Sequence, residues 1–233
     1  MQGETTTPSN QIFNSSVSLT SGWSIAIGIT VTLKYLKFTG ATGTNDSKPF
    51  FNLAGGAPAE NNALYMDTCI INGMTITDGS RDSVFGFSDN NGHTGYILDV
   101  RNTLIYGITL SAASSMSLFI EGGSGNSGTI NFVNNVIINN GTNPFTAIFS
   151  DSSGADTVTL TWKNNIIYSS TSIPFYSSAN QFNTNNISHS CNYNITSVPA
   201  GTGNITSDPL FVDAPNNNFN LRQTSPCIGT GAP

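Results

Sequence analysis

Acidic, basic and aromatic side chains recur at two positions of a repeated strand pattern, and these residues are the most able to do chemistry. One outward column takes a single residue from each repeat, and its members are Lys34, Asp67, Arg101, Val133 and Lys163. The outward column two residues earlier contains Thr32, Tyr65, Asp99, Asn131 and Thr161. The strand rise and the spacing between neighbouring strands then place Asp67 and Asp99 about 8 Å apart. Inverting glycosidases hold their two carboxylates about 6.5–9.5 Å apart, so this pair is a candidate for glycoside hydrolysis.

Three interpretations of these columns stay open. In a catalytic site, the reacting groups would be Asp67, Asp99 and Arg101. In a binding site, charge and ring stacking would hold an acidic glycan through Tyr65, Asp67, Asp99, Arg101 and Lys163. In a structural ladder, the alternating signs of Lys34, Asp67 and Arg101 would form ordinary cross-strand pairs. An arginine beside both acids would keep them ionised, which disfavours a general acid.

The elements that must position these residues are strands that recur every 30 to 34 residues. The five segments that align are Val31–Gly40, Leu64–Gly73, Leu98–Gly107, Ile130–Asn140 and Leu160–Ser169. Each begins with alternating apolar and polar residues, which predicts a strand with one buried face. The equivalent inward positions are Leu33, Met66, Val100, Phe132 and Trp162. The turn that follows each strand is predicted to form a polar ladder of Thr68, Asn102, Asn134 and Asn164.

A second strand in each repeat carries a phenylalanine. We predict that these rings form one internal column of Phe51, Phe85, Phe119, Phe149, Phe175 and Phe211. Strand, turn, strand and loop, repeated at a nearly constant period, indicate a solenoid in which coils stack in parallel. The predicted fold is therefore an all-β, single-domain parallel β-helix of about six to seven coils. Its predicted parts are an N-terminal segment with the first coil or cap (1–30), the coils (31–186), and the terminal coil with the C-terminal cap (187–233).

The end of the chain carries the most specific motifs. Residues 203–233 contain the runs D-P-L-F-V-D from Asp208, N-F-x-L from Asn218 and S-P-C-I-x-x-G from Ser225. This end resembles the terminal coil of secreted bacterial β-helix proteins. Residues 31–233 resemble the right-handed parallel β-helices of the pectin lyase-like superfamily, and they are similar to uncharacterised secreted domains of Bacteroidetes polysaccharide-utilisation proteins. The resemblance implies a right-handed helix, and it implies bound Ca²⁺ only if the chain is a lyase; otherwise no cofactor is expected.

Composition excludes some classes of function. The chain has 7 Lys and Arg against 13 Asp and Glu, and only 9% of its 233 residues are charged. So few cations cannot form the basic stripe that nucleic-acid binding needs. No apolar run approaches the roughly 20 residues of a membrane span. The surface must instead be built from neutral groups, of which Asn, with 30 residues, is the most abundant.

The opening residues, Met1–Thr7, lack the basic start and apolar core of a signal peptide. We nevertheless expect a secreted or cell-surface protein from which the signal has been removed, and the alternative is a protein that is not secreted by that route. The three cysteines, Cys69, Cys191 and Cys227, show no zinc-binding spacing. Cys191 and Cys227 enclose the terminal coil, and a disulfide between them or two free core thiols are both open. Cys69 is expected to be buried in the inner stack.

These observations favour an extracellular β-helix module that binds polysaccharide without catalysis, or that has an adhesin-like structural role at a cell surface or in a fibre. The expected partner is a polysaccharide or a cell-surface glycan, and self-association by stacking of coils is left open. The alternative is a polysaccharide lyase or glycoside hydrolase that acts on an acidic, uronate-containing glycan.

Overall fold

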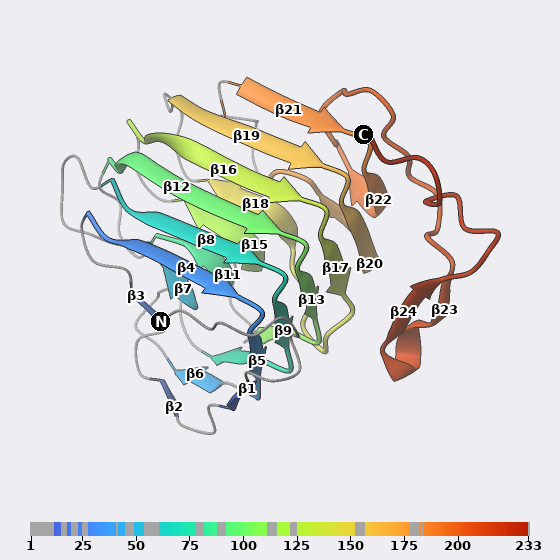
Figure 1. Ribbon diagram of the computed structural model, residues 1–233, viewed down its shortest axis with the longest axis horizontal. Helices are drawn as coiled ribbons and strands as arrows, with labels where there is room; N and C mark the ends of the chain where they lie inside the picture. Colours follow the sequence, from blue (N-terminus) through green and yellow to red (C-terminus); the bar gives the residue numbers. More distant parts are fainter. Residues whose placement is uncertain are drawn as a thin grey trace.

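Four parallel β-sheets wind around one apolar core in a computed structural model of the chain (Figure 1). The structure describes residues 12–14, 18–19, 23–24, 28–40, 42–44, 49–53, 61–77, 82–87, 92–110, 116–121, 125–151, 157–177, 182 and 184–232. The opening heptapeptide and the rest of residues 1–11 lie outside this part. Within the described part, no helix is long and apolar enough to cross a membrane.

We number the sheets in the order in which the chain visits them from β4 onward. Sheet 1 contains β4 (Thr30–Lys34), β8 (Ala63–Asp67), β12 (Thr94–Arg101), β16 (Ser127–Val133), β19 (Thr157–Lys163) and β21 (Thr184–Ser188). Sheet 2 contains β1 (Ile12–Asn14), β5 (Lys37–Thr39), β9 (Ile70–Asn72), β13 (Leu104–Tyr106), β17 (Val136–Asn139), β20 (Ile166–Pro174) and β22 (Cys191–Thr196). Sheet 3 contains β2 (Ser18–Leu19), β6 (Thr42–Thr44), β10 (Thr75–Thr77) and β14 (Thr109–Leu110). Sheet 4 contains β3 (Trp23–Ser24), β7 (Phe51–Asn52), β11 (Asp82–Gly86), β15 (Met116–Glu121) and β18 (Ala147–Asp151).

The all-β parallel β-helix is confirmed, but the predicted number of coils is too high. Three successive coils, β4–β7, β8–β11 and β12–β15, contribute a strand to all four sheets. In the described residues, the coils on either side of these three leave out one or more sheets. The period of sheets 1 and 2 continues through them, because those two sheets hold six and seven strands. Counting repeats of the sheet 1 strand therefore overestimates the number of complete coils.

The predicted inward column of sheet 1 is confirmed. Leu33 pairs with Met66, Met66 with Val100, Val100 with Phe132, and Phe132 with Trp162. All five side chains are at most 1% exposed. Because the side-chain period of a strand is two, this register also fixes which residues of sheet 1 face outward.

The predicted phenylalanine column holds for four of its six members. Phe51, Phe85, Phe119 and Phe149 pair in sequence along sheet 4, and each is at most 1% exposed. The prediction is wrong for Phe175, because Tyr176 makes the bridge to Phe149, although the Phe175 ring is buried 5.2 Å from the Phe149 ring. The prediction is also wrong for Phe211, which lies outside the stack in β23 (Phe211–Asp213). That strand pairs antiparallel with β24 (Asn218–Leu221) through the 3₁₀ turn η2 (Ala214–Asn216).

A column of left-handed residues forms the bend between sheets 1 and 2. Its members have φ between 50° and 58° and are Tyr35, Thr68, Asn102, Asn134, Asn164 and His189. We call it the turn column. Asn tolerates this backbone conformation better than most residues, which explains its recurrence here. Of the predicted amide ladder, the step from Asn134 Nδ2 to Asn102 Oδ1 is present at 3.3 Å, whereas the Asn164 side chain bonds to Ala232 instead.

A second polar column lies inside the bend, one residue later, and the sequence did not distinguish it from the first. Asn135 and Asn165 are each 1% exposed. The Asn135 side chain accepts the Thr103 N–H at 2.9 Å and donates to the Val100 carbonyl at 2.9 Å. Asn165 repeats this one coil later, accepting the Asn135 N–H at 2.9 Å and donating to the Phe132 carbonyl at 2.8 Å. Buried amides therefore satisfy the backbone groups that the bend takes out of the sheets.

Candidate binding site

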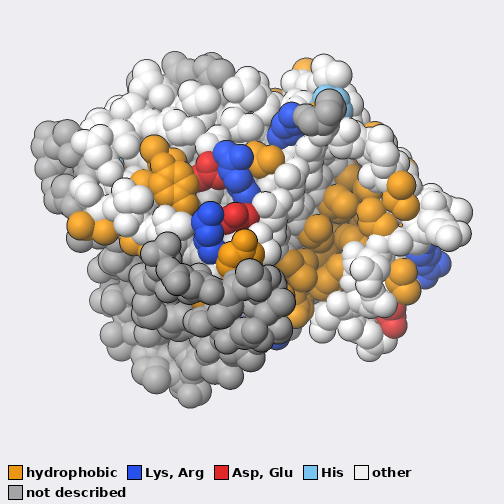
Figure 2. Space-filling model, viewed as in Figure 1, with side chains coloured by type: hydrophobic (Ala, Val, Ile, Leu, Met, Phe, Trp, Pro, Cys, Tyr) orange, Lys and Arg blue, Asp and Glu red, His pale blue; other side chains and the backbone are white. Residues whose placement is uncertain are grey.

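The outward residues of β4, β8 and β12 meet in a hollow of about 180 Å³ on sheet 1. Parallel pairing sets Asp99 beside Tyr65, and it sets Asp67 between Lys34 and Arg101. The lining of the hollow is Lys34, Tyr65, Met66, Asp67, Asp99 and Arg101. In Figure 2, blue and red side chains gather on this face. The structure therefore brings together Tyr65, Asp67, Asp99 and Arg101, as the column pattern predicts.

Arg101 and Asp99 form a two-pronged ion pair on one strand. The Arg101 guanidinium donates from Nε to Asp99 Oδ1 at 2.6 Å and from Nη2 to Asp99 Oδ2 at 2.9 Å. Asn131 Nδ2, on the next coil, donates to the same Oδ2 at 3.2 Å. This hydrogen bonding to Asp99 raises the pKa of Arg101 above its already high ordinary value. Asp99 itself is buried, so the pair is fixed more firmly than a surface ion pair.

Asp67 is held by a different set of donors. Its Oδ1 accepts from Asn102 Nδ2 at 2.8 Å and from Thr68 Oγ1 at 3.1 Å. Its Oδ2 lies 3.7 Å from Lys34 Nζ, in a pair whose side chains are 47% and 31% exposed. Each carboxylate oxygen of the hollow therefore faces a donor, and the two cations balance the two anions.

The hydrogen bonds and ion pairs of the hollow disfavour catalysis by its carboxylates and its arginine. A general acid needs a carboxyl group that carries a proton, whereas both oxygens of Asp99 already accept N–H bonds. A lyase base must take a proton, and the guanidinium of Arg101 is held protonated against Asp99. Any Ca²⁺ here would have to bind Asp67 and Asp99, whose oxygens face nitrogen donors. Among the residues that the structure describes, no three His, Cys, Asp or Glu side chains gather as metal ligands.

Lys163 is the one predicted binding residue that does not line the hollow. It lies on β19, in the same outward column as Arg101, with Val133 of β16 between them. Two strand spacings separate the backbones of Lys163 and Arg101 by about 10 Å. Lys34 belongs to the same outward column but was not predicted as a binding residue. It lines the hollow from β4, on the side of Asp67 away from Arg101. Asn102 and Asn131, which hold the carboxylates, were not predicted as site residues.

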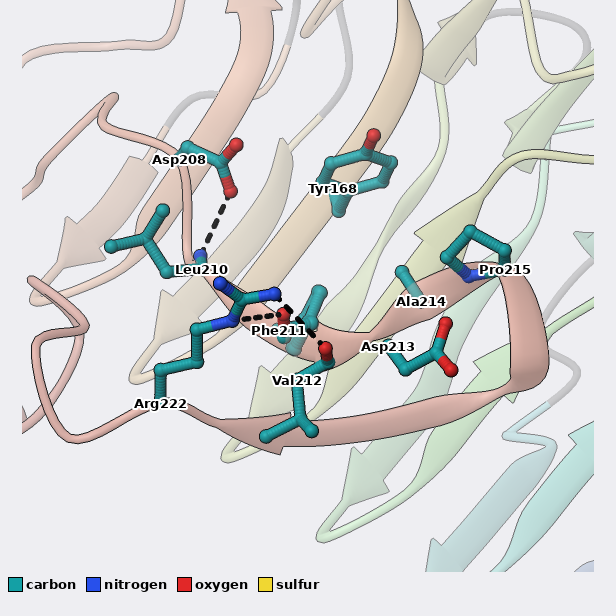
Figure 3. A pocket seen from close by; sticks show the side chains of 9 residues that line it. All are labelled: Tyr168, Asp208, Leu210, Phe211, Val212, Asp213, Ala214, Pro215 and Arg222. Atoms are coloured by element: carbon teal, nitrogen blue, oxygen red, sulfur yellow. Dashed lines mark hydrogen bonds between the residues drawn. The ribbon is translucent and has the colours of Figure 1, made fainter.

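A larger cavity of about 290 Å³ lies where the C-terminal hairpin meets sheet 2 (Figure 3). Its charged groups Asp208, Asp213 and Arg222 all make contacts within the chain. Arg222 donates from Nε to the Phe211 carbonyl at 3.2 Å and from Nη2 to the Val212 carbonyl at 3.1 Å. Asp208 Oδ1 accepts the Leu210 N–H at 2.8 Å. Because these hydrogen bonds stabilise the hairpin itself, we interpret this cavity as a gap in the packing between the hairpin and sheet 2, and not as a ligand site.

Comparison with known proteins gives no family model, no curated protein and no solved structure that matches the chain. The parallel β-helix therefore rests on the strand pairing described above. Nothing in these comparisons supports the narrower resemblance to the pectin lyase-like superfamily or to Bacteroidetes proteins, which remains part of the proposal below.

Proposed function

We propose that the chain is an extracellular, non-catalytic polysaccharide-binding module, and that the hollow on sheet 1 receives one sugar ring. The observation that carries the proposal is the Tyr65 ring beside a charge-balanced hollow of fixed donors and acceptors. Sugars present C–H faces that pack on aromatic rings and hydroxyls that bond to carboxylates and amides. The hollow is smaller than the roughly 300–1,000 Å³ of an enclosed small-molecule site, as expected for a shallow contact with one ring of a long chain.

The balance of charge favours a neutral glycan as the ligand. Lys34 and Arg101 are matched by Asp67 and Asp99, so the hollow offers little net attraction to a uronate. An acidic glycan would depend on Lys163, which lies outside the hollow. The likeness of residues 203–233 to the ends of secreted β-helix proteins supports an extracellular location. A lyase or hydrolase of acidic glycans is the alternative, and the engaged carboxylates count against it.

The experiment is a binding screen of the full chain against neutral and uronate-containing polysaccharides, with the products assayed for unsaturated ends. For a polysaccharide that binds, Tyr65→Ala should weaken the affinity about tenfold or more, because aromatic anchors dominate such contacts. Tyr65→Phe should keep most of the affinity, because the ring remains. Tyr193→Ala, which removes a tyrosine from the outer face of sheet 2, is the matched control and should leave the affinity unchanged.

Three results would contradict the proposal. Equal affinity in Tyr65→Ala and the parent would place any binding elsewhere on the molecule. Steady release of unsaturated ends would show a lyase. If no polysaccharide in the panel binds, the adhesin-like structural role becomes the better explanation.

A further inference from the structure

Two cysteines from different parts of the terminal region converge on one short segment. Cys191 begins β22 and is 3% exposed, and its thiol donates to the Ser207 carbonyl at 3.2 Å. Cys227 lies in the last turns of the chain and is partly exposed. Its N–H donates to Ser225 Oγ at 3.2 Å, and that hydroxyl donates to the Pro209 carbonyl at 2.6 Å. The segment 207–209 therefore contacts Cys191 directly and Cys227 through Ser225.

The two free thiols also lie near enough to shift each other's pKa, and they are not equivalent. The side-chain interaction between the two thiols lowers the pKa of Cys227, while the same interaction and burial raise the pKa of Cys191. Cys227 is thus the thiol that ionises more readily, and it is also the more exposed of the two. A reactive thiol beside a buried partner is the arrangement in which a disulfide forms in two steps.

We propose that Cys191 and Cys227 are a redox pair whose disulfide fastens the C-terminal cap to the last coil of the solenoid. By the cap we mean residues 207–232, which contain the β23–β24 hairpin. The hairpin lies within the loop that the bond would close. Without the bond, the cap depends on ring contacts and on a few hydrogen bonds, among them the Asn164 side chain, which donates to the Ala232 carbonyl and accepts its N–H.

The oxidant is a small-molecule disulfide such as oxidised glutathione. The Cys227 thiolate attacks one sulfur of the oxidant, which forms a mixed disulfide and releases one thiolate. Cys191 then gives up its proton and attacks the Cys227 sulfur, and the second thiolate leaves. Two protein thiols are oxidised and one small disulfide is reduced to two thiols, so atoms and electrons balance.

Cys69 provides an internal control within the same chain. Its thiol is 2% exposed and lies 3.4 Å from both the Leu33 and Asp67 carbonyls. Burial raises the pKa of Cys69 to about 11. We therefore expect Cys69 to stay a thiol under conditions that oxidise the terminal pair.

The test is to incubate the folded full chain with oxidised glutathione at pH 8 and to alkylate it without reductant. We expect a mass about 2 Da lower than the reduced chain before alkylation, one alkylated cysteine after denaturation, and a peptide map that links Cys191 to Cys227. The cap should become more protected from hydrogen exchange, and the melting temperature should rise by roughly 5–15 °C. Cys69→Ser should behave as the parent does, and Cys227→Ser should lose both effects.

Three alkylated thiols after this treatment would overturn the proposal. A stable mixed disulfide at Cys227 would also overturn it, because Cys191 would then be unable to reach its partner. A bond to Cys69, or a bond between two chains only, would be equally incompatible with it. A correctly linked bond that leaves cap exchange and melting unchanged would refute the fastening role.

Discussion

The outer faces of sheets 1 and 2 belong to the same coils and meet along the turn column, yet their chemistry is opposite. On sheet 1, the outward columns bring charged residues into the hollow. On sheet 2, one outward column is apolar through successive coils, with Ile70, Leu104, Val136 and Ile166 in register. Figure 2 shows the two kinds of surface side by side, the charged cluster and an orange band.

The two faces also differ in whether the cap packs on them. The Phe219 ring of the cap lies 5.1 Å from Tyr106, and the Phe211 ring lies 6.1 Å from Tyr168, both on sheet 2. Between these tyrosines, Ile138 faces outward but is only 1% exposed. The cap therefore covers the column of Tyr106, Ile138 and Tyr168 on sheet 2, whereas the apolar column beside it stays partly exposed. The hollow on sheet 1 is open and polar, and it is the surface that the proposed function uses.

The largest effect should come from comparing two variants of one coil, a valine-to-aspartate substitution on sheet 2 and the same substitution on sheet 1. Val133 and Val136 are both half-buried, but Val133 faces outward on sheet 1 between Arg101 and Lys163, whereas Val136 faces outward on sheet 2 between Leu104 and Ile166. Val136→Asp should lower the free energy of unfolding by about 2–4 kcal/mol, because it places a carboxylate in an apolar column.

Val133→Asp should change the free energy of unfolding by no more than about 1 kcal/mol, because the new charge faces two cations. Urea denaturation of both variants measures the difference. Equal losses would mean that the two faces do not differ as described.

A medium effect should come from Phe219→Ala, which removes the ring that packs on Tyr106. Loss of a half-buried ring and of its edge contact should cost about 1–2 kcal/mol of cap docking. Hydrogen exchange should rise in β24 while the core strands of sheet 1 keep their protection. Val212→Ala is the control, because Val212 is 41% exposed, and it should change neither region. Faster exchange throughout the solenoid would show that the cap is not a separate layer.

The smallest effect should come from Lys34→Ala on sheet 1. The Lys34–Asp67 pair is 3.7 Å long and exposed, so its loss should cost less than about 1 kcal/mol. The loss should shrink further at 1 M salt, where the screening length falls to about 3 Å. Melting curves at low and high salt are sufficient to detect it. A loss that is large and independent of salt would show that Lys34 is a packing residue.

Strand alternation was sufficient to predict the register of sheet 1, because a slip of one residue would turn every inward side chain outward. The same logic failed near the end of the chain. Phe175 and Phe211 fit the spacing of the column, but the last coils omit sheets, and the chain leaves the stack after Ile205, which still bridges Cys191 in parallel. A period in the sequence does not reveal that departure.

The candidate site was predictable only in part. The columns placed Tyr65, Asp67, Asp99 and Arg101 together, because parallel pairing sets equivalent residues side by side. The amides that hold the carboxylates were harder to find among 30 asparagines. Asn134 and Asn135 are adjacent and identical in type, yet one is exposed in the turn column and the other is buried. Backbone geometry decides between them, and the residue letters do not.

The turn column also has a consequence for how such a chain can change in length. Asn134 and Asn102 are 32 residues apart and occupy equivalent points of neighbouring coils. Removing residues 103–134 would join Asn102 to Asn135, which repeats the junction that Asn134 makes now. The excised piece contains one strand from each of the four sheets, β13 to β16. A recombination event between two such asparagines would therefore delete or duplicate a whole coil. The alternation of inward and outward side chains would stay the same on both sides of the new junction.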